Sequence, residues 1–239
     1  MTDAATSAGD LPVLFEDNHV LIVDKPAGLA TMGALPGVDT ACERARRYIK
    51  RVYAKPGNVY LGVVSRLDSL VTGVLPLART SKAAARLSAS FAEGLARKTY
   101  LALVSGDRLP DFERLENQVA HDDRAQRMYC TRQAGRGQLA QLEYRVLGRS
   151  GTWQLLVVDL LTGRKHQIRV QLAARGCPIL GDRKYGSHEE FPAGIGLHAR
   201  RLVVPHPVQA EPIDVAAPLP GSWLQVLDRD TRTVVQQQT

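Results

Sequence analysis

The chain has 239 residues, of which 44% are hydrophobic and 23% charged, so it can bury a core and does not have the composition of a disordered or fibrous protein. Lys and Arg outnumber Asp and Glu by 31 to 24, and the resulting net charge of +7 fits a polyanionic partner. Charge alone does not distinguish RNA from DNA or a membrane surface. The three cysteines are widely separated, which indicates neither a disulfide framework nor a zinc site and fits the reducing cytoplasm.

The two ends of the chain carry no signal for export or membrane insertion. The opening residues lack a basic segment followed by an apolar one, and no run of 18 apolar residues occurs anywhere. We therefore predict a cytoplasmic protein with no membrane span, and we expect a monomer. Residues 1–10 and 228–239 lack an apolar period, which predicts flexible tails on either side of a single domain over residues 11–227.

The first predicted elements are a strand and a basic helix. The β-branched run 20–23 stops at residues 25–28, Lys-Pro-Ala-Gly, and is typical of a buried strand that enters a turn. Thr40, with Glu43 three residues later, forms a capping-box signature that predicts a helix over 41–52. The helix is a candidate phosphate-binding surface, and a solvated face is an equal alternative. Its basic residues are Arg44, Arg46, Arg47, Lys50 and Arg51.

The same periodic signals predict the rest of the chain, and strands separated by single helices indicate a mixed α/β arrangement. Residues 121–138 are polar and rich in arginine, which favours a mobile hairpin or long loop and a second contact with a polyanionic partner. The other predicted elements are a helix from Ser81 to about Leu95, a strand over 98–104, a strand over 153–161, a turn at 162–164, and a short helix around Ile168 and Leu172 that stops at Gly176.

An Arg-Leu-Asp sequence at residues 66–68 is the first candidate for chemistry. By pattern alone, Asp68 is more typical of a turn than of a catalytic site. The segment from Ser65 to Thr80, however, resembles the R-L-D motif of pseudouridine synthases of the RluA type. Further blocks resemble the same family in the same order, and together they extend from Leu14 to about Pro218. These blocks are residues 14–28, 98–104, 161–172, 176–186, 197–199 and 206–207.

This resemblance implies a fold and an activity. The fold it implies is α+β, with a mixed, mainly antiparallel central sheet and flanking helices. The activity it implies is an isomerase that converts uridine to pseudouridine in ribosomal or transfer RNA, with RNA as partner and with no cofactor and no metal. The six histidines also show no spacing that is typical of metal ligands.

The resemblance also implies roles for individual residues. Asp68 is the expected catalytic carboxylate, Tyr100 stacks on the target base, and Arg169 is the ion-pair partner of Asp68. Arg66 helps to displace the target nucleotide, which must leave a duplex before its buried atoms can react. Read from its neighbours alone, His166 is expected to support the turn at 162–164. The residues implied to bind substrate are Arg66, Thr72, Arg164, His166, Gln167 and Ile168.

The route of the reaction and the activity itself have open alternatives. Asp68 can attack the sugar or base covalently, or remove a sugar proton and leave a glycal-like intermediate. Ser65 stands where the family usually has histidine, and residues 69–71 replace a usual polar triplet, so an RNA-binding relative without catalysis is the second hypothesis. A glycosidase-like pair of Asp68 with Asp182 is the third and least favoured one.

Overall fold

The computed structural model describes residues 10–33, 38–133 and 135–238, so the predicted tail over 1–10 lies outside the described residues except for Asp10. The chain divides into two compact units, where the sequence predicted one domain. The first unit comprises residues 1–96 and 202–217, and the second comprises residues 97–201 and 218–239. Strand β10, Leu197–Val204, begins in the second unit and ends in the first.

In the first unit, strands pair in the order β1-β2-β4-β10, with β3 against β4 and β11 against β10. The bounds are β1 Val13–Glu16, β2 Val20–Lys25, β3 Gly62–Val63, β4 Thr72–Ala78 and β11 Ile213–Ala216. Strands β2 and β4 are antiparallel, from Val20 opposite Ala78 to Lys25 opposite Gly73. Every residue of β4 is buried, as expected for a strand covered on both faces.

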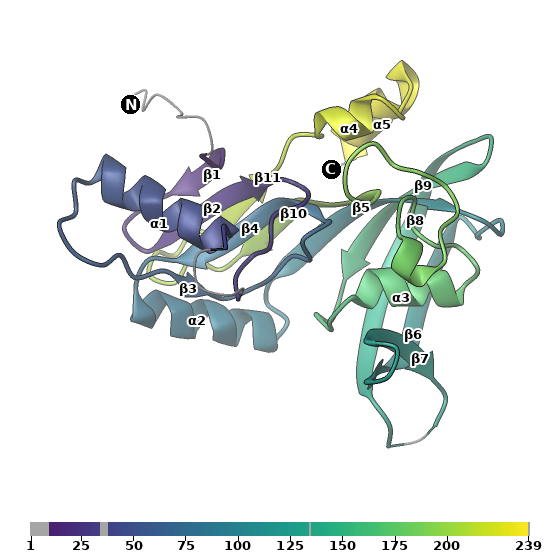
Figure 1. The fold of residues 1–239 in the computed structure, drawn as a ribbon, viewed down its shortest axis with the longest axis horizontal. Coiled ribbons are helices and arrows are strands. Elements are labelled where there is room, and N and C mark those ends of the chain that lie inside the picture. The colour runs from purple at the N-terminus through teal and green to yellow at the C-terminus, as the bar shows by residue number, and fades with distance from the viewer. Residues whose placement is uncertain (1–9, 34–37, 134, 239) are drawn as a thin grey trace. The chain divides into compact units, whose positions relative to one another are not determined.

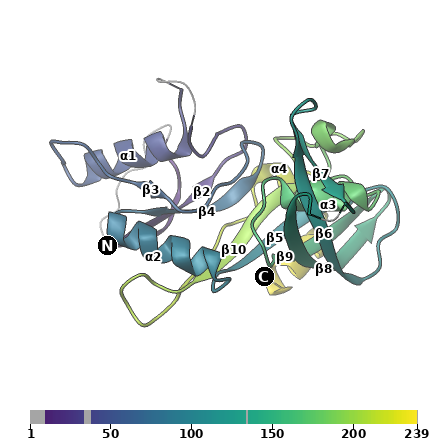
Figure 2. The ribbon, with the colours of Figure 1, turned by 90° about the horizontal axis from the view of Figure 1, so that it is seen from below.

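Two helices cover these strands from opposite sides (Figures 1 and 2). Helix α1 is Ala41–Val52, as predicted, and the Thr40 side chain accepts a hydrogen bond from the backbone N–H of Glu43 at 3.2 Å. Helix α2 is Ser81–Ala92, and it ends before Gly94, whose φ of 74° suits glycine. Helix α1 begins where its capping signal placed it, because a cap is a local feature, and α2 begins at Ser81 as the apolar spacing predicted.

In the second unit, the strand order is β10-β5-β9-β8-β6-β7, and the pairs from β5 onward are antiparallel. The bounds are β5 Arg97–Ser105, β6 Phe112–Asp122, β7 Arg127–Thr131, β8 Gln138–Ser150 and β9 Trp153–Leu160. The predicted hairpin over 121–138 is present, with β6 and β7 joined by a turn at residues 123–126. The predicted fold class, α+β with a mainly antiparallel sheet, is confirmed.

The helices of the second unit lie on the two faces of its strands. Helix α3, Gln167–Ala174, packs Val170 against Val119 and Ala140, and the register places Tyr100 on this same face. The other face is covered by helix α4, Gly221–Leu224, and helix α5, Arg229–Gln238, through buried Trp223 and Val235. Residues 229–238 are thus a helix rather than the flexible tail that the sequence predicted, because Val235 packs into the core. None of the helices in the described part of the chain is both long and apolar enough to cross a membrane.

Candidate active site

Asp68 lies in the loop between β3 and β4 of the first unit. The loop is fixed by Leu67, which is only 8% exposed. The Thr31 hydroxyl donates to the carbonyl of Leu67 at 2.8 Å and accepts from its N–H at 3.1 Å, so one side chain satisfies both backbone groups. With Leu67 turned into the core, Arg66 is exposed and Asp68 is half-buried.

Lys25 is the second anchor of this loop, and it is fully buried. Its ammonium group donates to the carbonyls of Pro26 and Leu29, both at 2.8 Å, and of Ser69 at 3.1 Å. Burial lowers the pKa of Lys25 to about 8, while the negative charges of Asp68 and Asp24 act in the opposite direction. Lys25 therefore lies within electrostatic range of Asp68.

The sequence did not reveal this function of Lys25. Residues 25–28 were interpreted only as a turn, because nothing in a Lys-Pro-Ala-Gly sequence shows where the ammonium group points. The turn does meet the loop of Asp68, since the N–H of Gly28 donates to the carbonyl of Ser69 at 2.8 Å. Thr72, a predicted substrate-binding residue, is buried at the start of β4, and its binding role stays a prediction.

In the second unit, Arg169 forms a buried ion pair with Asp182. Its Nε and Nη2 donate to the two carboxylate oxygens at 2.7 and 2.8 Å, and the side chains are 4% and 1% exposed. Such a two-point pair fixes the plane of the guanidinium group. Because both oxygens of Asp182 accept from Arg169, this carboxylate is poorly suited to act as the second acid of a glycosidase-like pair.

Tyr185 joins the helix that carries Arg169 to strand β7. The guanidinium of Arg169 lies 5.0 Å from the centre of the Tyr185 ring. The Tyr185 hydroxyl accepts from the N–H of Met128 at 3.1 Å and lies 2.8 Å from Nδ1 of His166. His166 precedes α3 with a left-handed φ of 54°, and its side chain contacts Tyr185, so the expected support of the turn at 162–164 stays a prediction. Asp182 and Tyr185 belong to the block at residues 176–186 that resembles the family, and no supporting role was predicted for either residue.

The turn before α3 is held by Gln167, which is buried. Its side-chain oxygen accepts from the Thr162 hydroxyl at 2.8 Å and from the N–H of Arg164 at 3.0 Å, and its amide donates to Gln141 O at 2.9 Å. The partners of Gln167 in these contacts are protein groups, so the contacts explain the shape of the turn and do not test a role in binding substrate. The implied roles of Arg164, His166, Gln167 and Ile168 in binding substrate stay predictions, as does an ion pair of Arg169 with Asp68.

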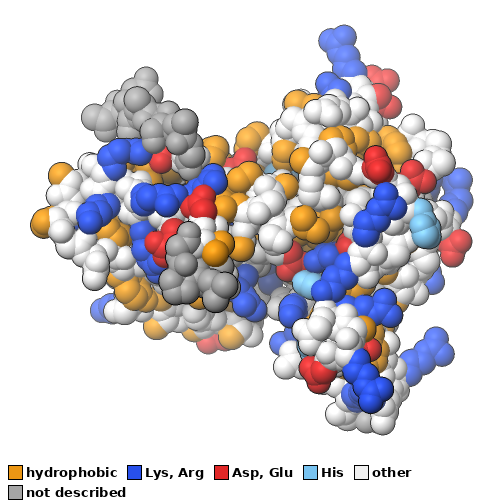
Figure 3. Space-filling view, in the orientation of Figure 1, with side chains coloured by type: hydrophobic (Ala, Val, Ile, Leu, Met, Phe, Trp, Pro, Cys, Tyr) orange, Lys and Arg blue, Asp and Glu red, His pale blue; other side chains and the backbone are white. Residues whose placement is uncertain are grey.

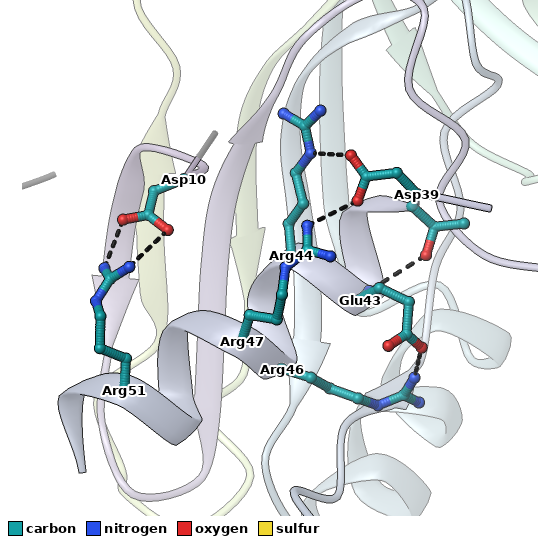
Figure 4. Close-up of polar contacts among 8 residues, drawn as sticks. Asp10, Asp39, Glu43, Arg44, Arg46, Arg47 and Arg51 are labelled. Atoms are coloured by element: carbon teal, nitrogen blue, oxygen red, sulfur yellow. Dashed lines mark hydrogen bonds and ion pairs between the residues drawn. The ribbon is translucent and has the colours of Figure 1, made fainter. Parts of the chain in front are cut away.

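The basic helix α1 is less positive than its sequence indicated (Figure 4). Asp39 accepts from Arg44 at 2.7 Å and from Arg47 at 2.8 Å. Glu43 pairs with Arg46 and Asp10 with Arg51, so three carboxylates lie among the five basic side chains. Lys and Arg side chains gather on the surface over α1 and also around β6 and β7 (Figure 3). The pairing favours a solvated helix face over a dedicated phosphate site.

Within the ranges that the structure describes, no three His, Cys, Asp or Glu side chains gather as metal ligands would. A hollow of about 560 Å³ beside α1 is lined by Arg46 and residues 58–61, and none of the predicted site residues lines it. Each unit therefore offers one candidate cluster, around Asp68 in the first and around Arg169 in the second.

Known protein families provide the decisive comparison. A family model described as RNA pseudouridylate synthase matches residues 19–174, which is more than half of the chain. The chain belongs to this family. It is therefore an RNA-modifying isomerase, and the resemblance to RluA-type synthases is confirmed.

Individual relatives agree over most of the chain. The dual-specificity RNA pseudouridine synthase RluA of Escherichia coli is 32% identical over 214 residues, which cover 87% of this chain and 93% of the relative. The ribosomal large subunit pseudouridine synthase D of Xanthomonas campestris is 34% identical over 233 residues, covering 92% and 69%. The solved structure of human RNA pseudouridylate synthase domain containing 4 matches with a TM-score of 0.76 over 93% of each chain, at 24% identity, and supports the fold.

Proposed function

We propose that this pseudouridine synthase modifies large-subunit ribosomal RNA and that Asp68 is its catalytic carboxylate. The observation that carries the assignment is the loop at residues 66–69, in which Leu67 and Ser69 are tied to Thr31 and Lys25. This anchoring holds the half-buried Asp68 next to the exposed Arg66. The choice of RNA rests on relatives named as ribosomal large subunit synthases, from Rickettsia bellii and Xanthomonas campestris.

The reaction needs a group that can assist cleavage at the sugar. The bond between C1′ and uracil N1 breaks, the uracil turns, C5 bonds to C1′, the C5 proton leaves, and N1 takes up a proton from water. Atoms and electrons balance without an oxidant or reductant, so the proposal includes no cofactor. A carboxylate at Asp68 serves either as a nucleophile or as a base for a sugar proton, and both routes release the C5 hydrogen.

The second unit supplies groups suited to binding the base. Tyr100 offers an aromatic face, and stacking contributes about 1–3 kcal/mol per base without selecting a particular base. Arg169, with its plane set by Asp182 and Tyr185, offers a fixed positive charge for the ion pair with Asp68. Arg66 occupies the space that the displaced nucleotide leaves. We further propose that the protein acts as a monomer in the cytoplasm.

The substrate is tested with transcripts labelled at uracil C5 with tritium. Purified protein is incubated separately with unmodified large-subunit ribosomal RNA, small-subunit ribosomal RNA and transfer RNA, and the released tritium is counted. We expect release from the large-subunit transcript. Release from transfer RNA alone contradicts the choice of RNA, and tight binding without release from any transcript favours the alternative of an RNA-binding relative without catalysis.

A further inference from the structure

Two cationic residues, Lys98 and Arg164, lie near each other at the start of β5, with Lys98 on the Tyr100 face of the second unit. Lys98 is half-buried, and its ammonium lies against the turn at residues 162–164, since a Cβ placed on Gly163 would stand 3.3 Å from Lys98 Nζ. Arg164, the next residue of that turn, is exposed. The fold thus places the Lys98 ammonium beside the turn that carries Arg164, although the two segments are more than sixty residues apart in the sequence.

The two charges interact unfavourably. Burial, and in addition the positive charge of Arg164, lower the pKa of Lys98. Like charges held close together raise the energy of the protein, and an anion placed between them lowers it again. An arrangement of this kind is typical of a binding site for a negatively charged group.

The arrangement is also built into rigid structure. Gln167 fixes the backbone of Arg164, and Arg164 Nε donates to the carbonyl of Leu139 at 2.9 Å, which orients the guanidinium group. Little reorganisation is needed for an anion to bind here.

The distance between Lys98 and the predicted stacking residue Tyr100 matches the span of one nucleotide. Lys98 and Tyr100 are two residues apart on one strand, so their side chains share a face and their Cα atoms lie about 7 Å apart. A nucleotide spans a comparable distance between its base and its phosphate. A base that stacks on Tyr100 therefore brings a phosphate of the same RNA strand within reach of Lys98.

We propose that Lys98 and Arg164 form a binding site for one backbone phosphate of the RNA, next to the target nucleotide. The inference rests on the proposed function, because it takes RNA as the ligand. Phosphate oxygens accept hydrogen bonds from the ammonium and the guanidinium, and condensed counterions leave the RNA when these bonds form. The contact carries no sequence information and sets the register of the strand.

The test compares two matched pairs of substitutions. Lys98→Gln with Arg164→Gln removes the proposed site, and Arg97→Gln with Lys165→Gln removes the same charge from two exposed neighbours. Binding to an unmodified large-subunit ribosomal RNA transcript is measured between about 50 and 200 mM salt. We expect the first pair to weaken binding about tenfold and to reduce the slope of log K against log salt by about one, well beyond the control pair.

Two further outcomes keep the inference separate from folding and from the proposed function. Lys98→Arg retains the charge and is expected to keep the salt slope of the wild type. Equal slopes for the two double variants overturn the phosphate site. Tritium release by wild type from the same transcript is measured in parallel. Release with equal slopes overturns the phosphate site alone, and a selective loss of slope without release overturns the proposed choice of RNA alone.

Discussion

Lys25 places a buried ammonium group beside the loop that carries Asp68. Three carbonyl groups, from Pro26, Leu29 and Ser69, accept its hydrogen bonds, and two of them belong to its own turn. An unpaired carbonyl that stays buried costs about 1–3 kcal/mol. The ammonium therefore holds the turn and the loop of Asp68 together as one structure.

Lys25→Met keeps the length of the side chain and removes all three donors. We predict a loss of about 2 kcal/mol in the free energy of unfolding, because the freed carbonyls are poorly hydrated. Urea unfolding followed by circular dichroism measures the change. Lys55→Met, at an exposed position, is the matched control, and equal unfolding midpoints for the two variants contradict the role of Lys25.

Tyr100 is predicted to act through its ring rather than its hydroxyl. Tyr100→Phe keeps the stacking surface, so tritium release is expected to stay close to the wild-type rate. Tyr100→Ala removes the surface, and a loss of about 1–3 kcal/mol in stacking corresponds to about a tenfold to hundredfold slower release at low RNA concentration. Equal losses in both variants point instead to proton transfer by the hydroxyl.

At the scale of elements, Asp17 fastens the turn between β1 and β2 to the segment after β10. Its Oδ1 accepts from the N–H groups of His19 and Val20 at 2.8 and 2.6 Å, and its Oδ2 accepts from His206 Nε2 at 2.7 Å. His206 Nδ1 accepts from two backbone N–H groups, those of Val208 and Gln209, which places the ring proton on Nε2. The contact joins distant parts of the first unit.

This contact makes stability depend on pH. Burial raises the pKa of Asp17, but the hydrogen bonds and His206 outweigh it, so the pKa lies below its ordinary value of 3.8. A carboxyl with a lowered pKa in the folded state stabilises the protein above about pH 4, and the contribution is lost as the pH falls through the lowered value. Asp17→Asn is predicted to cost about 1–2 kcal/mol at pH 7 and less at pH 3. Urea unfolding at both pH values checks this, and a constant difference contradicts it.

Elements whose signals are local were predictable, and those held by distant contacts were not. Helix α1 begins and ends where Thr40, Glu43 and the apolar spacing placed it. Helix α5 has few apolar residues of its own, and only the core of Leu101, Leu155 and Trp223 around Val235 explains its packing. The pairing of Asp39 with two arginines of α1 likewise depends on a loop conformation that composition does not reveal.

At the scale of the molecule, the residues with proposed roles in the reaction are divided between two compact units. Asp68 and Arg66 belong to the first, and Tyr100, Arg164 and Arg169 belong to the second. Motifs in family order were sufficient to predict the isomerase family and the fold class. The supporting residues Lys25, Thr31 and Asp182 required the structure, because they contact Ser69, Leu67 and Arg169, which lie 13 to 44 residues away in the sequence.

The catalytic role of Asp68 is tested most directly by tritium release from C5-labelled large-subunit ribosomal RNA, measured for Asp68→Asn, wild type and Asp123→Asn. The control replaces an aspartate whose side chain is 93% exposed and removes the same charge. We predict wild-type release by Asp123→Asn and at least a thousandfold slower release by Asp68→Asn, with RNA binding retained by both. Release by Asp68→Asn at a rate close to wild type contradicts the assignment of Asp68.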